Sequence, residues 1–314
     1  VESDTLNVTS GDDFTIANQA ADVVETINVT GTAAIDATIT TSTATTYTGD
    51  SNVTFVGDHA LFHQAEVSGG ALLEVNAMNA ATDLSKATGA IELSAAVSSG
   101  ILSVNDNATI TMSADMAGME INADDDVTNT ATTFLQGTLN LVLANDQSST
   151  LVIDHSAAST DGFDTINVTA TAAQTTGLDI TGTAGASGTT INVLGSKAVT
   201  IASGTDAKII NGSAMTGALT ASSTATALEV TGGSGNDSLT SDLTVTTSII
   251  NAGDGNDSVD LGAAFTGTAN GGNGADTLDV TAAVDISAAT ITGFETIDIT
   301  NFDVTLDEAL VNGQ

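Results

Sequence analysis

Three copies of one short phrase contain the residues best suited to bind a metal ion. They occupy residues 232–239, 252–259 and 271–278, and each reads G-G-x-G-x-D-x followed by Leu or Val, with Ala252 in place of the first glycine of the middle copy. Glycine allows a backbone turn whose carbonyl groups face inward, because no Cβ stands in the way. The aspartate adds a carboxylate to the same ring of oxygens. Such a cage suits a hard cation, and a nonapeptide of this form is a calcium-binding repeat of parallel β-helices.

The spacing of the aspartates indicates how the copies are arranged. Asp237, Asp257 and Asp276 are 20 and 19 residues apart, which gives one copy per coil of a solenoid. Equivalent positions on successive coils of parallel strands lie roughly 4.8 Å apart, so we expect the turns to stack along one edge and to share cations. The alternative is that the copies are glycine-rich loops of ordinary hairpins.

The predicted calcium ligands come from the turn and the aspartate of each copy. They are Gly232, Gly233, Ser234, Gly235 and Asp237; Gly253, Asp254, Gly255 and Asp257; and Gly271, Gly272, Asn273, Gly274 and Asp276. Leu239, Val259 and Leu278 each follow an aspartate by two residues. They are expected to point into the core, because alternate residues of a strand face the same side.

The charge of the chain also favours bound cations. There are 39 acidic residues against 3 basic ones, and the formal net charge is -36. Self-repulsion of this size opposes a compact state unless cations neutralise it. The same charge excludes nucleic acid as a partner, since no basic patch is available for phosphates, and it disfavours docking on anionic lipid.

Short segments rich in Val, Ile and Thr recur along the chain and predict an all-β fold. Examples are residues 5–9, 26–30, 52–56, 72–75, 109–112, 138–143, 151–153, 190–193 and 198–201. Aromatic residues make up only 3% of the chain, too few for a typical sandwich core, whereas Ala, Thr and Val suit a thin core stacked coil on coil. We therefore predict a right-handed parallel β-helix or β-roll-like solenoid, elongated and calcium-stabilised. Short helices are expected at residues 58–67 and 77–86 only.

A longer segment recurs at intervals of about 130 to 140 residues, which is a usual domain size. Residues 156–169 align without a gap on residues 287–300, and residues 23–30 form a shorter third copy. The predicted divisions are an N-terminal β segment that is similar to the end of a calcium module (1–30), a β-rich body (31–155), a β-rich solenoid segment (156–231), a calcium-binding β-roll (232–300) and a C-terminal segment (301–314).

The combination of these features resembles one family. The G-G-x-G-x-D turns, the Gly-Phe-Glu-Thr-Ile segment from Gly293, the Thr-, Ala- and Ser-rich strands, the absence of cysteine and the scarcity of basic residues look like bacterial surface-layer (S-layer) proteins with repeats-in-toxin (RTX) modules. The resemblance covers residues 232–300 well, and the body resembles the family in composition only.

The resemblance implies a secreted protein of a Gram-negative bacterium that folds on meeting extracellular calcium. It implies self-assembly into a two-dimensional lattice on the cell surface, with outer-membrane lipopolysaccharide or a surface polysaccharide as the anchor. No enzymatic activity, nucleic acid partner or membrane insertion is expected. The alternative is a biofilm-matrix or adhesin segment of a larger RTX protein, for which local Thr-rich stretches such as residues 38–46 give some support.

Other residues with chemical potential give weaker signals. β-Helix lyases and epimerases commonly use Arg or Lys, and this chain has no Arg. The acidic run 124–126 resembles a solvated or cation-binding turn more than a glycosidase pair. His59 and His63 have the spacing of two zinc ligands on one helix face but lack the glutamate of a zinc-protease motif. His155 is isolated and receives no role.

The sequence gives little information on compartment from other sources. Cysteine is absent, so no disulfide pattern can be read. The sequence contains no apolar run of about 18 residues, so no membrane-spanning helix is predicted. The sequence starts Val-Glu-Ser-Asp without an initiator Met or signal peptide, so we expect that a leader has been removed or that this is an excised piece.

Overall fold

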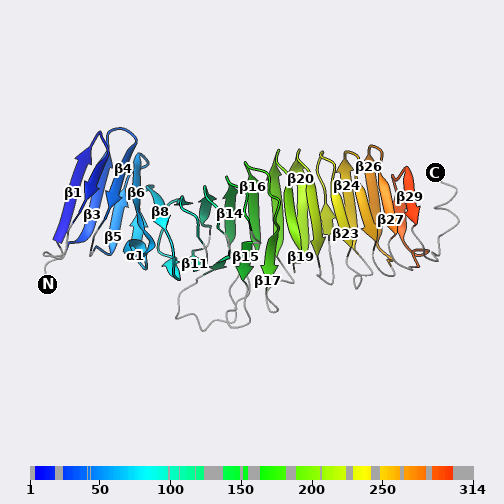
Figure 1. Ribbon diagram of the computed structural model, residues 1–314, viewed down its shortest axis with the longest axis horizontal. Helices are drawn as coiled ribbons and strands as arrows, with labels where there is room; N and C mark the ends of the chain where they lie inside the picture. Colours follow the sequence, from blue (N-terminus) through cyan, green and yellow to red (C-terminus); the bar gives the residue numbers. More distant parts are fainter. Residues whose placement is uncertain are drawn as a thin grey trace. The chain divides into compact units, whose positions relative to one another are not determined.

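The computed structural model consists almost entirely of parallel β-strands wound as a β-solenoid (Figure 1). It describes residues 4–17, 24–40, 42, 44–97, 100–105, 107–116, 118–123, 137–148, 151–154, 163–181, 189–205, 207–223, 229–241, 248–261, 265–280 and 285–299. The predicted all-β solenoid is confirmed, and its stabilisation by calcium stays a prediction. Within the described ranges, no helix is long and apolar enough to cross a membrane.

The chain divides into two compact units, the first formed by Val1–Asp154 with Asp161–Phe163. Its strands are β1 (Asp4–Ser10), β2 (Phe14–Ile16), β3 (Val24–Gly31), β4 (Ile35–Ile39), β5 (Thr46–Gly49), β6 (Val53–Asp58), β7 (Glu66–Ser68), β8 (Leu72–Ala77), β9 (Thr82–Leu84), β10 (Ile91–Leu93), β11 (Gly100–Val104), β12 (Thr109–Met112), β13 (Met119–Ala123), β14 (Thr138–Leu143) and β15 (Leu151–Asp154). The even-numbered strands follow one another in one sheet. The odd-numbered strands β1 to β7 and β9 to β15 form two further runs.

The second unit comprises His155–Thr160 and Asp164–Gln314. Its strands are β16 (Thr165–Ala170), β17 (Leu178–Thr181), β18 (Thr190–Gly195), β19 (Val199–Thr205), β20 (Ile209–Met215), β21 (Leu219–Ser223), β22 (Glu229–Thr231), β23 (Ser238–Ser241), β24 (Ile249–Asp254), β25 (Ser258–Leu261), β26 (Thr268–Asn273), β27 (Thr277–Val280), β28 (Thr290–Thr292) and β29 (Thr296–Ile299). Even-numbered strands pair in one sheet and odd-numbered strands in the other. Each coil therefore contributes one strand to each sheet.

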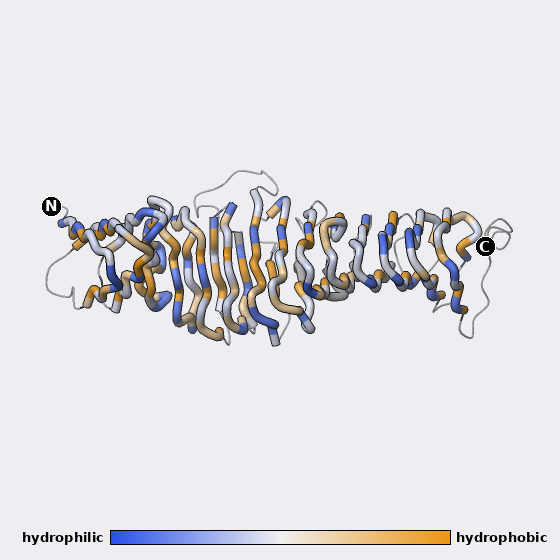
Figure 2. Tube along the Cα trace, turned by 90° about the horizontal axis from the view of Figure 1, so that it is seen from above, coloured by the Kyte–Doolittle hydropathy of each residue, from blue (hydrophilic) through white to orange (hydrophobic). Residues whose placement is uncertain are grey.

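Alternation along the strands explains why each sheet has an inner and an outer face. In β14 and β16 every second residue is buried, and hydropathy alternates in the same way along many strands (Figure 2). Leu239, Val259 and Leu278 are buried in the core, which confirms the predicted parity. Large aliphatic side chains such as Ile27, Leu73 and Leu93 are buried in this core. Rings also gather around Tyr47, whose ring centroid lies 5.5 Å from that of Phe55 and 5.3 Å from that of Phe62.

The helix predictions are partly correct. The only helix among the described residues is α1 (His59–Phe62), which Asp58 caps by accepting a hydrogen bond from the Ala60 amide at 2.9 Å. The helix is shorter than the predicted range 58–67, because the chain enters β7 at Glu66. The prediction of a helix over 77–86 is wrong. Those residues contain β9, whose Thr82 and Leu84 are buried with Asp83 between them, a strand pattern that overrides the local helix propensity.

The longer sequence repeat does not mark one recurring place in the fold. Its Thr-Ile cores fall in β3, β16 and β29. Within the second unit, β16 belongs to the even-numbered sheet and β29 to the odd-numbered sheet. Similar strands are thus used on both sides of the solenoid, and the predicted division into five segments stays a prediction.

Replacing a buried residue of the stack should destabilise the second unit far more than replacing an exposed one. Leu278 is 0% exposed and Ile249 is 43% exposed. Leu278→Ala is expected to lower the free energy of unfolding by about 2–5 kcal/mol through lost burial and the cavity it leaves. Ile249→Ala should change it by less than about 1 kcal/mol. Urea unfolding in calcium measures both, and equal losses would contradict this description of the core.

Candidate cation-binding site

Three aspartates form a row along one edge of the second unit. Asp237, Asp257 and Asp276 each stand immediately before a strand of the odd-numbered sheet, namely β23, β25 and β27. The residues that follow them pair directly, Ser258 with both Ser238 and Thr277. The aspartates are therefore one coil apart, as their spacing predicts. We call these three side chains the aspartate row.

The aspartate row is connected by hydrogen bonds from main chain to side chain. The Asp237 amide donates to Asp257 Oδ1 at 2.8 Å, and the Asp257 amide donates to Asp276 Oδ1 at 2.8 Å. Each carboxylate thus reaches back to the amide of the preceding coil. These bonds fix the position of each turn relative to the next along the stacking direction of the coils.

The three carboxylates are buried, but they are not equally satisfied. Asp237, Asp257 and Asp276 are 3%, 2% and 0% exposed. Both oxygens of Asp237 accept hydrogen bonds at 2.7 Å, from the amides of Leu219 and Gly233. Asp257 Oδ2 and Asp276 Oδ2 have no hydrogen-bond partner. A buried carboxylate oxygen without a donor costs desolvation free energy. These two atoms are therefore the candidate ligands for a cation.

The backbone of the turns explains this difference. Gly253 and Gly272, in the second and third turns, have φ values of +110° and +105°, a conformation that strongly favours glycine. A Cβ on Gly272 would overlap the carbonyl oxygen of Gly253. Gly233, at the equivalent position of the first turn, is not in this conformation, and its amide closes on Asp237 instead. The second and third turns consequently leave their carboxylates open.

Burial raises the pKa of two members of the aspartate row. The pKa of Asp257 rises to about 6 because the side chain is desolvated. The Asp237 amide opposes this rise, and the neighbouring charges of Asp237, Asp276 and Asp254 add to it. The pKa of Asp237 is also raised by burial, against the two amides that donate to it. Ionisation of these carboxyl groups therefore costs free energy in the folded chain, and a bound cation would offset this cost.

Oxygen atoms are the only ligands that this edge offers to a metal. Among the described residues, no group of three or more Asp, Glu, His or Cys side chains forms a metal cluster, so a cation here depends on main-chain carbonyls as well as carboxylates. Carbonyl oxygens of the preceding turns occupy the spaces that side chains would fill at Gly255 and Gly274, where a Cβ would also lie 2.9 Å from Asp257 Oδ1 and 3.2 Å from Asp276 Oδ1. The unpartnered carboxylate oxygens and these carbonyls together fit the ligand chemistry of calcium.

Three of the predicted ligands have side chains on the outside of the turns. Ser234, Asp254 and Asn273 are exposed. Asp254 Oδ1 accepts a hydrogen bond from Asn273 Nδ2 at 2.8 Å, which links the second and third turns on their outer side. The structure therefore brings Asp254 and Asn273 to each other and places the three buried aspartates in a separate, inner row.

Sequence reasoning missed one member of this edge. Glu295 lies one coil beyond Asp276 and accepts a hydrogen bond from the Asp276 amide at 2.7 Å. The signal was present, since Glu295 follows Asp276 by 19 residues, the spacing of the preceding pair. It was overlooked because the glycine-rich turn is replaced by Gly293 and Phe294.

A second acidic row lies on the outer face of the same sheet and was also not predicted. Asp260, Asp279 and Asp298 are in register on β25, β27 and β29. Asp279 Oδ2 accepts a hydrogen bond from Ser258 Oγ at 2.6 Å. Like charges on neighbouring strands repel, so this row adds to the electrostatic cost of the second unit.

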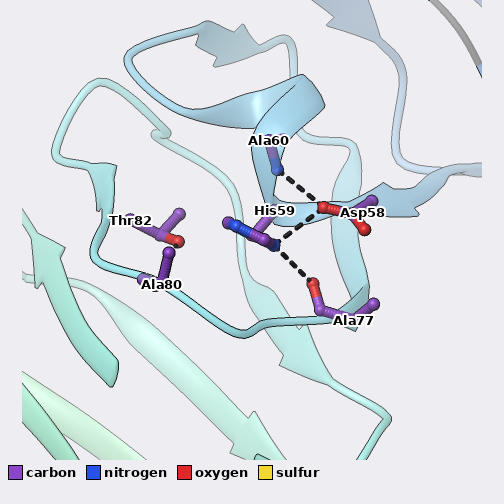
Figure 3. Close-up of polar contacts among 6 residues, drawn as sticks. All are labelled: Asp58, His59, Ala60, Ala77, Ala80 and Thr82. Atoms are coloured by element: carbon purple, nitrogen blue, oxygen red, sulfur yellow. Dashed lines mark hydrogen bonds and ion pairs between the residues drawn. The ribbon is translucent and has the colours of Figure 1, made fainter. Parts of the chain in front are cut away.

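The two histidines of the first unit form polar contacts within that unit, and Figure 3 shows those of His59. His59 Nδ1 lies 2.7 Å from Asp58 Oδ1 and 3.1 Å from the Ala77 carbonyl, while His63 Nδ1 accepts from the Asp83 amide at 3.1 Å. These bonds fasten α1 to the chain beside it. The acidic run 124–126 and His155 lie outside the described residues.

Lysine side chains do not compensate the acidic ones within the part of the chain that the structure describes. His59 forms an ion pair with Asp58, and no ion pair in that part involves Lys86, Lys197 or Lys208. Comparison of the chain with protein-family models, with curated proteins and with solved structures gives no match. The function must therefore be argued from the aspartate row itself.

In the presence of chelator, the stability of the second unit should fall as pH rises from about 4 to about 6. The folded-state pKa of Asp257 lies above its ordinary value of 3.8, so the folded chain holds this proton more tightly than the unfolded chain. Asp257→Asn removes this titration. It should reduce the fall in the free energy of unfolding over this pH range by up to about 3 kcal/mol. Urea unfolding as a function of pH measures it.

The control for the pH experiment is Glu229→Gln, because Glu229 is an exposed carboxylate of the same unit outside the row. Its pH profile should match that of the unaltered chain. Identical profiles for Asp257→Asn and the unaltered chain would contradict the description of Asp257.

A side chain on Gly272 should disrupt the stack of turns. Gly272→Ala places a methyl group on the Gly253 carbonyl and strains the backbone at φ +105°. The matched control is Gly70→Ala, where φ is +93° but the nearest atom to a Cβ is 3.9 Å away. Gly70→Ala should cost about 1–2 kcal/mol from backbone strain alone, and Gly272→Ala clearly more. Urea unfolding of each variant tests this, and equal costs would show that the turns are not closely stacked.

Proposed function

We propose that this protein is a secreted, calcium-dependent structural protein that assembles into a lattice, an S-layer, on the surface of a Gram-negative bacterium. The observation that carries the proposal is the pair of buried carboxylate oxygens without a partner, Asp257 Oδ2 and Asp276 Oδ2, in a row of stacked glycine turns. The resemblance to RTX-bearing surface-layer proteins supplies the assembly and its location.

Calcium is the cation that best suits this edge. The available ligands are carboxylate and carbonyl oxygens, and calcium accepts six to eight such ligands in flexible geometry. Magnesium demands stricter geometry and keeps its water, while zinc prefers the nitrogen and sulfur ligands that the aspartate row does not contain. We therefore propose that carboxylate and carbonyl oxygens around the three aspartates bind calcium, as the sequence predicts.

The chain's own residues perform most of the structural work. The aspartate row sets the height of successive turns through its bonds to the preceding amides. At Gly255 and Gly274 the missing side chains let a carbonyl of the preceding turn come close to the carboxylates of Asp257 and Asp276. Bound calcium would supply positive charge between these oxygens. With that charge in place the turns hold together, and without it the carboxylates of neighbouring coils repel each other.

Dependence on calcium fits a protein that works outside the cell. A chain with a formal net charge of -36 remains loose while calcium is scarce, and gains structure where calcium reaches the affinity range of extracellular modules, about 10⁻⁴–10⁻³ M. Folding after export follows from this difference. It also keeps acidic copies apart until cations are present.

Assembly follows from the same charge balance. Acidic edges of neighbouring copies repel, and divalent cations lower this repulsion more effectively than monovalent salt, which screens charge without occupying the turns. We propose self-association into sheets as the main interaction. Outer-membrane lipopolysaccharide or a surface polysaccharide is the proposed anchor, and no catalytic step is part of the function.

A biofilm-matrix or adhesin segment of a larger RTX protein is the second candidate. It is favoured by a continuous outer row of hydroxyl groups in register on five strands, made by Thr220, Ser238, Ser258, Thr277 and Thr296. Together with the outer aspartates, these hydroxyls offer hydrogen-bonding groups to a polysaccharide. Saccharide binding by single molecules that form no sheets would favour this candidate.

Calcium should control both stability and assembly. Each occupied site is expected to stabilise the folded chain by about 2.7 kcal/mol at a hundredfold excess of calcium over Kd. Thermal unfolding and light scattering are measured in chelator, in concentrated sodium chloride and in calcium. We expect a raised Tm and large particles in calcium alone, with ordered sheets by electron microscopy. Equal melting and equal particle size in all three would refute the proposed function.

The row also predicts an order among its members. Asp257 contacts the turns before and after its own, and one of its oxygens is unpartnered, whereas both oxygens of Asp237 are satisfied by amides. Asp257→Ala is therefore expected to reduce the stabilisation by calcium more than Asp237→Ala does. The opposite order, measured by Tm with and without calcium, would contradict this assignment.

A further inference from the structure

The carboxylate edge continues past the last glycine-rich turn to Glu295. Thr277 pairs with Thr296, so Glu295 occupies the position of the aspartates on the next coil. The Asp276 amide donates to Glu295 Oε2 at 2.7 Å, as the Asp257 amide donates to Asp276 Oδ1 at 2.8 Å. Glu295 therefore takes the place of a fourth aspartate, in a turn that lacks the G-G-x-G-x-D phrase.

The space beside this turn gathers further oxygens. A Cβ built on Gly271 would overlap the Gly293 carbonyl oxygen and would lie 2.9 Å from Asp276 Oδ2. Two oxygens thus face the small space left by the missing side chain of Gly271. Asp276 is fully buried, and its Oδ2 has no hydrogen-bond partner. A buried carboxylate oxygen without a donor, next to a main-chain carbonyl, points to a bound cation.

The other end of the row provides an internal comparison. A Cβ on Gly232 would meet the Ala252 carbonyl oxygen and Asp237 Oδ2 in the same way. There, however, the Gly233 amide donates to Asp237 Oδ2, whereas Asp276 Oδ2 has no donor. The two ends therefore differ in whether the buried carboxylate oxygen is satisfied by the main chain.

We infer that Asp276, Gly293 and Glu295 form a calcium site that ends the row, with Asp276 Oδ2, the Gly293 carbonyl and the Glu295 carboxylate as ligands. This inference rests on the proposed calcium dependence and adds a ligand from outside the glycine-rich phrase. Two carboxylates with main-chain oxygen fit calcium, since ligand charge sets its affinity. The site joins β29 (Thr296–Ile299), the final strand in the described ranges, to the calcium-bound turns.

The test separates the charge of Glu295 from its hydrogen bond. Glu295→Gln keeps an acceptor oxygen for the Asp276 amide and removes the charge, whereas Glu295→Asp keeps the charge. Calcium alone is titrated into the chelated full chain by calorimetry, and bound ions are counted by native mass spectrometry. The control is Glu229→Gln, the same substitution at an exposed position outside the row.

We expect Glu295→Gln to bind one calcium ion fewer at a concentration that saturates the unaltered chain, or to bind one ion about tenfold or more weakly. Glu295→Asp should retain more of this affinity, and Glu229→Gln should match the unaltered chain. In chelator, Glu295→Gln should unfold as the unaltered chain does, because the hydrogen bond to Asp276 is kept.

Three results would overturn the inference. If Glu295→Gln binds as many ions as tightly as the unaltered chain while Asp257→Asn loses calcium, Glu295 is no ligand and the proposed function stands. If Glu295→Gln lowers stability equally with and without calcium, Glu295 acts only as a hydrogen-bond partner. An unaltered chain that binds no calcium at all would remove the inference and the proposed function together.

Discussion

Parallel stacking in register is the constraint on which the second unit depends. Because each coil repeats the register of the one before, a residue type at a given coil position meets its own kind one strand away. For asparagine this is favourable, as Asn192 Nδ2 donates to Asn167 Oδ1 at 2.9 Å and Asn211 Nδ2 donates to Asn192 Oδ1 at 3.2 Å. For aspartate the same rule brings carboxylates together, and the side chains cannot donate to one another.

The aspartate row solves this problem only in part. Main-chain amides of the preceding coil satisfy one oxygen of each aspartate, and a second amide satisfies Asp237 completely. Asp257 and Asp276 keep one buried oxygen each without a donor. The positive φ of Gly253 and Gly272 maintains this openness, since the equivalent glycine of the first turn closes on its own aspartate. The glycine phrase thus produces two kinds of turn, and only the open kind leaves a buried carboxylate oxygen without a donor.

Much of this fold could be predicted from the sequence, because alternation of Val, Ile and Thr with polar residues reports directly which side of a strand is buried. Strands such as β12 and β14 and the stacking of the three aspartates follow from pattern and spacing. The helix expected over 77–86 was wrong, since stacking of β9 against its neighbours outweighs local propensity. The difference between Asp237 and Asp257 was not predictable, because it arises from φ angles of glycines that look alike in sequence. Glu295 was missed because its turn lacks the glycine phrase, although its spacing continues the row.

Amide hydrogen exchange at Asp237, Asp257 and Asp276 tests the central claim most directly, because these amides report whether each carboxylate is seated against the preceding coil. The exchange rates are compared in calcium and in chelator with sodium chloride added to equal ionic strength. We predict strong protection of the three amides in calcium and its loss in chelator, with much smaller changes at buried amides of the first unit such as those of β6. Equal protection of the three amides in both conditions would show that the row is stable without a cation and would contradict the account.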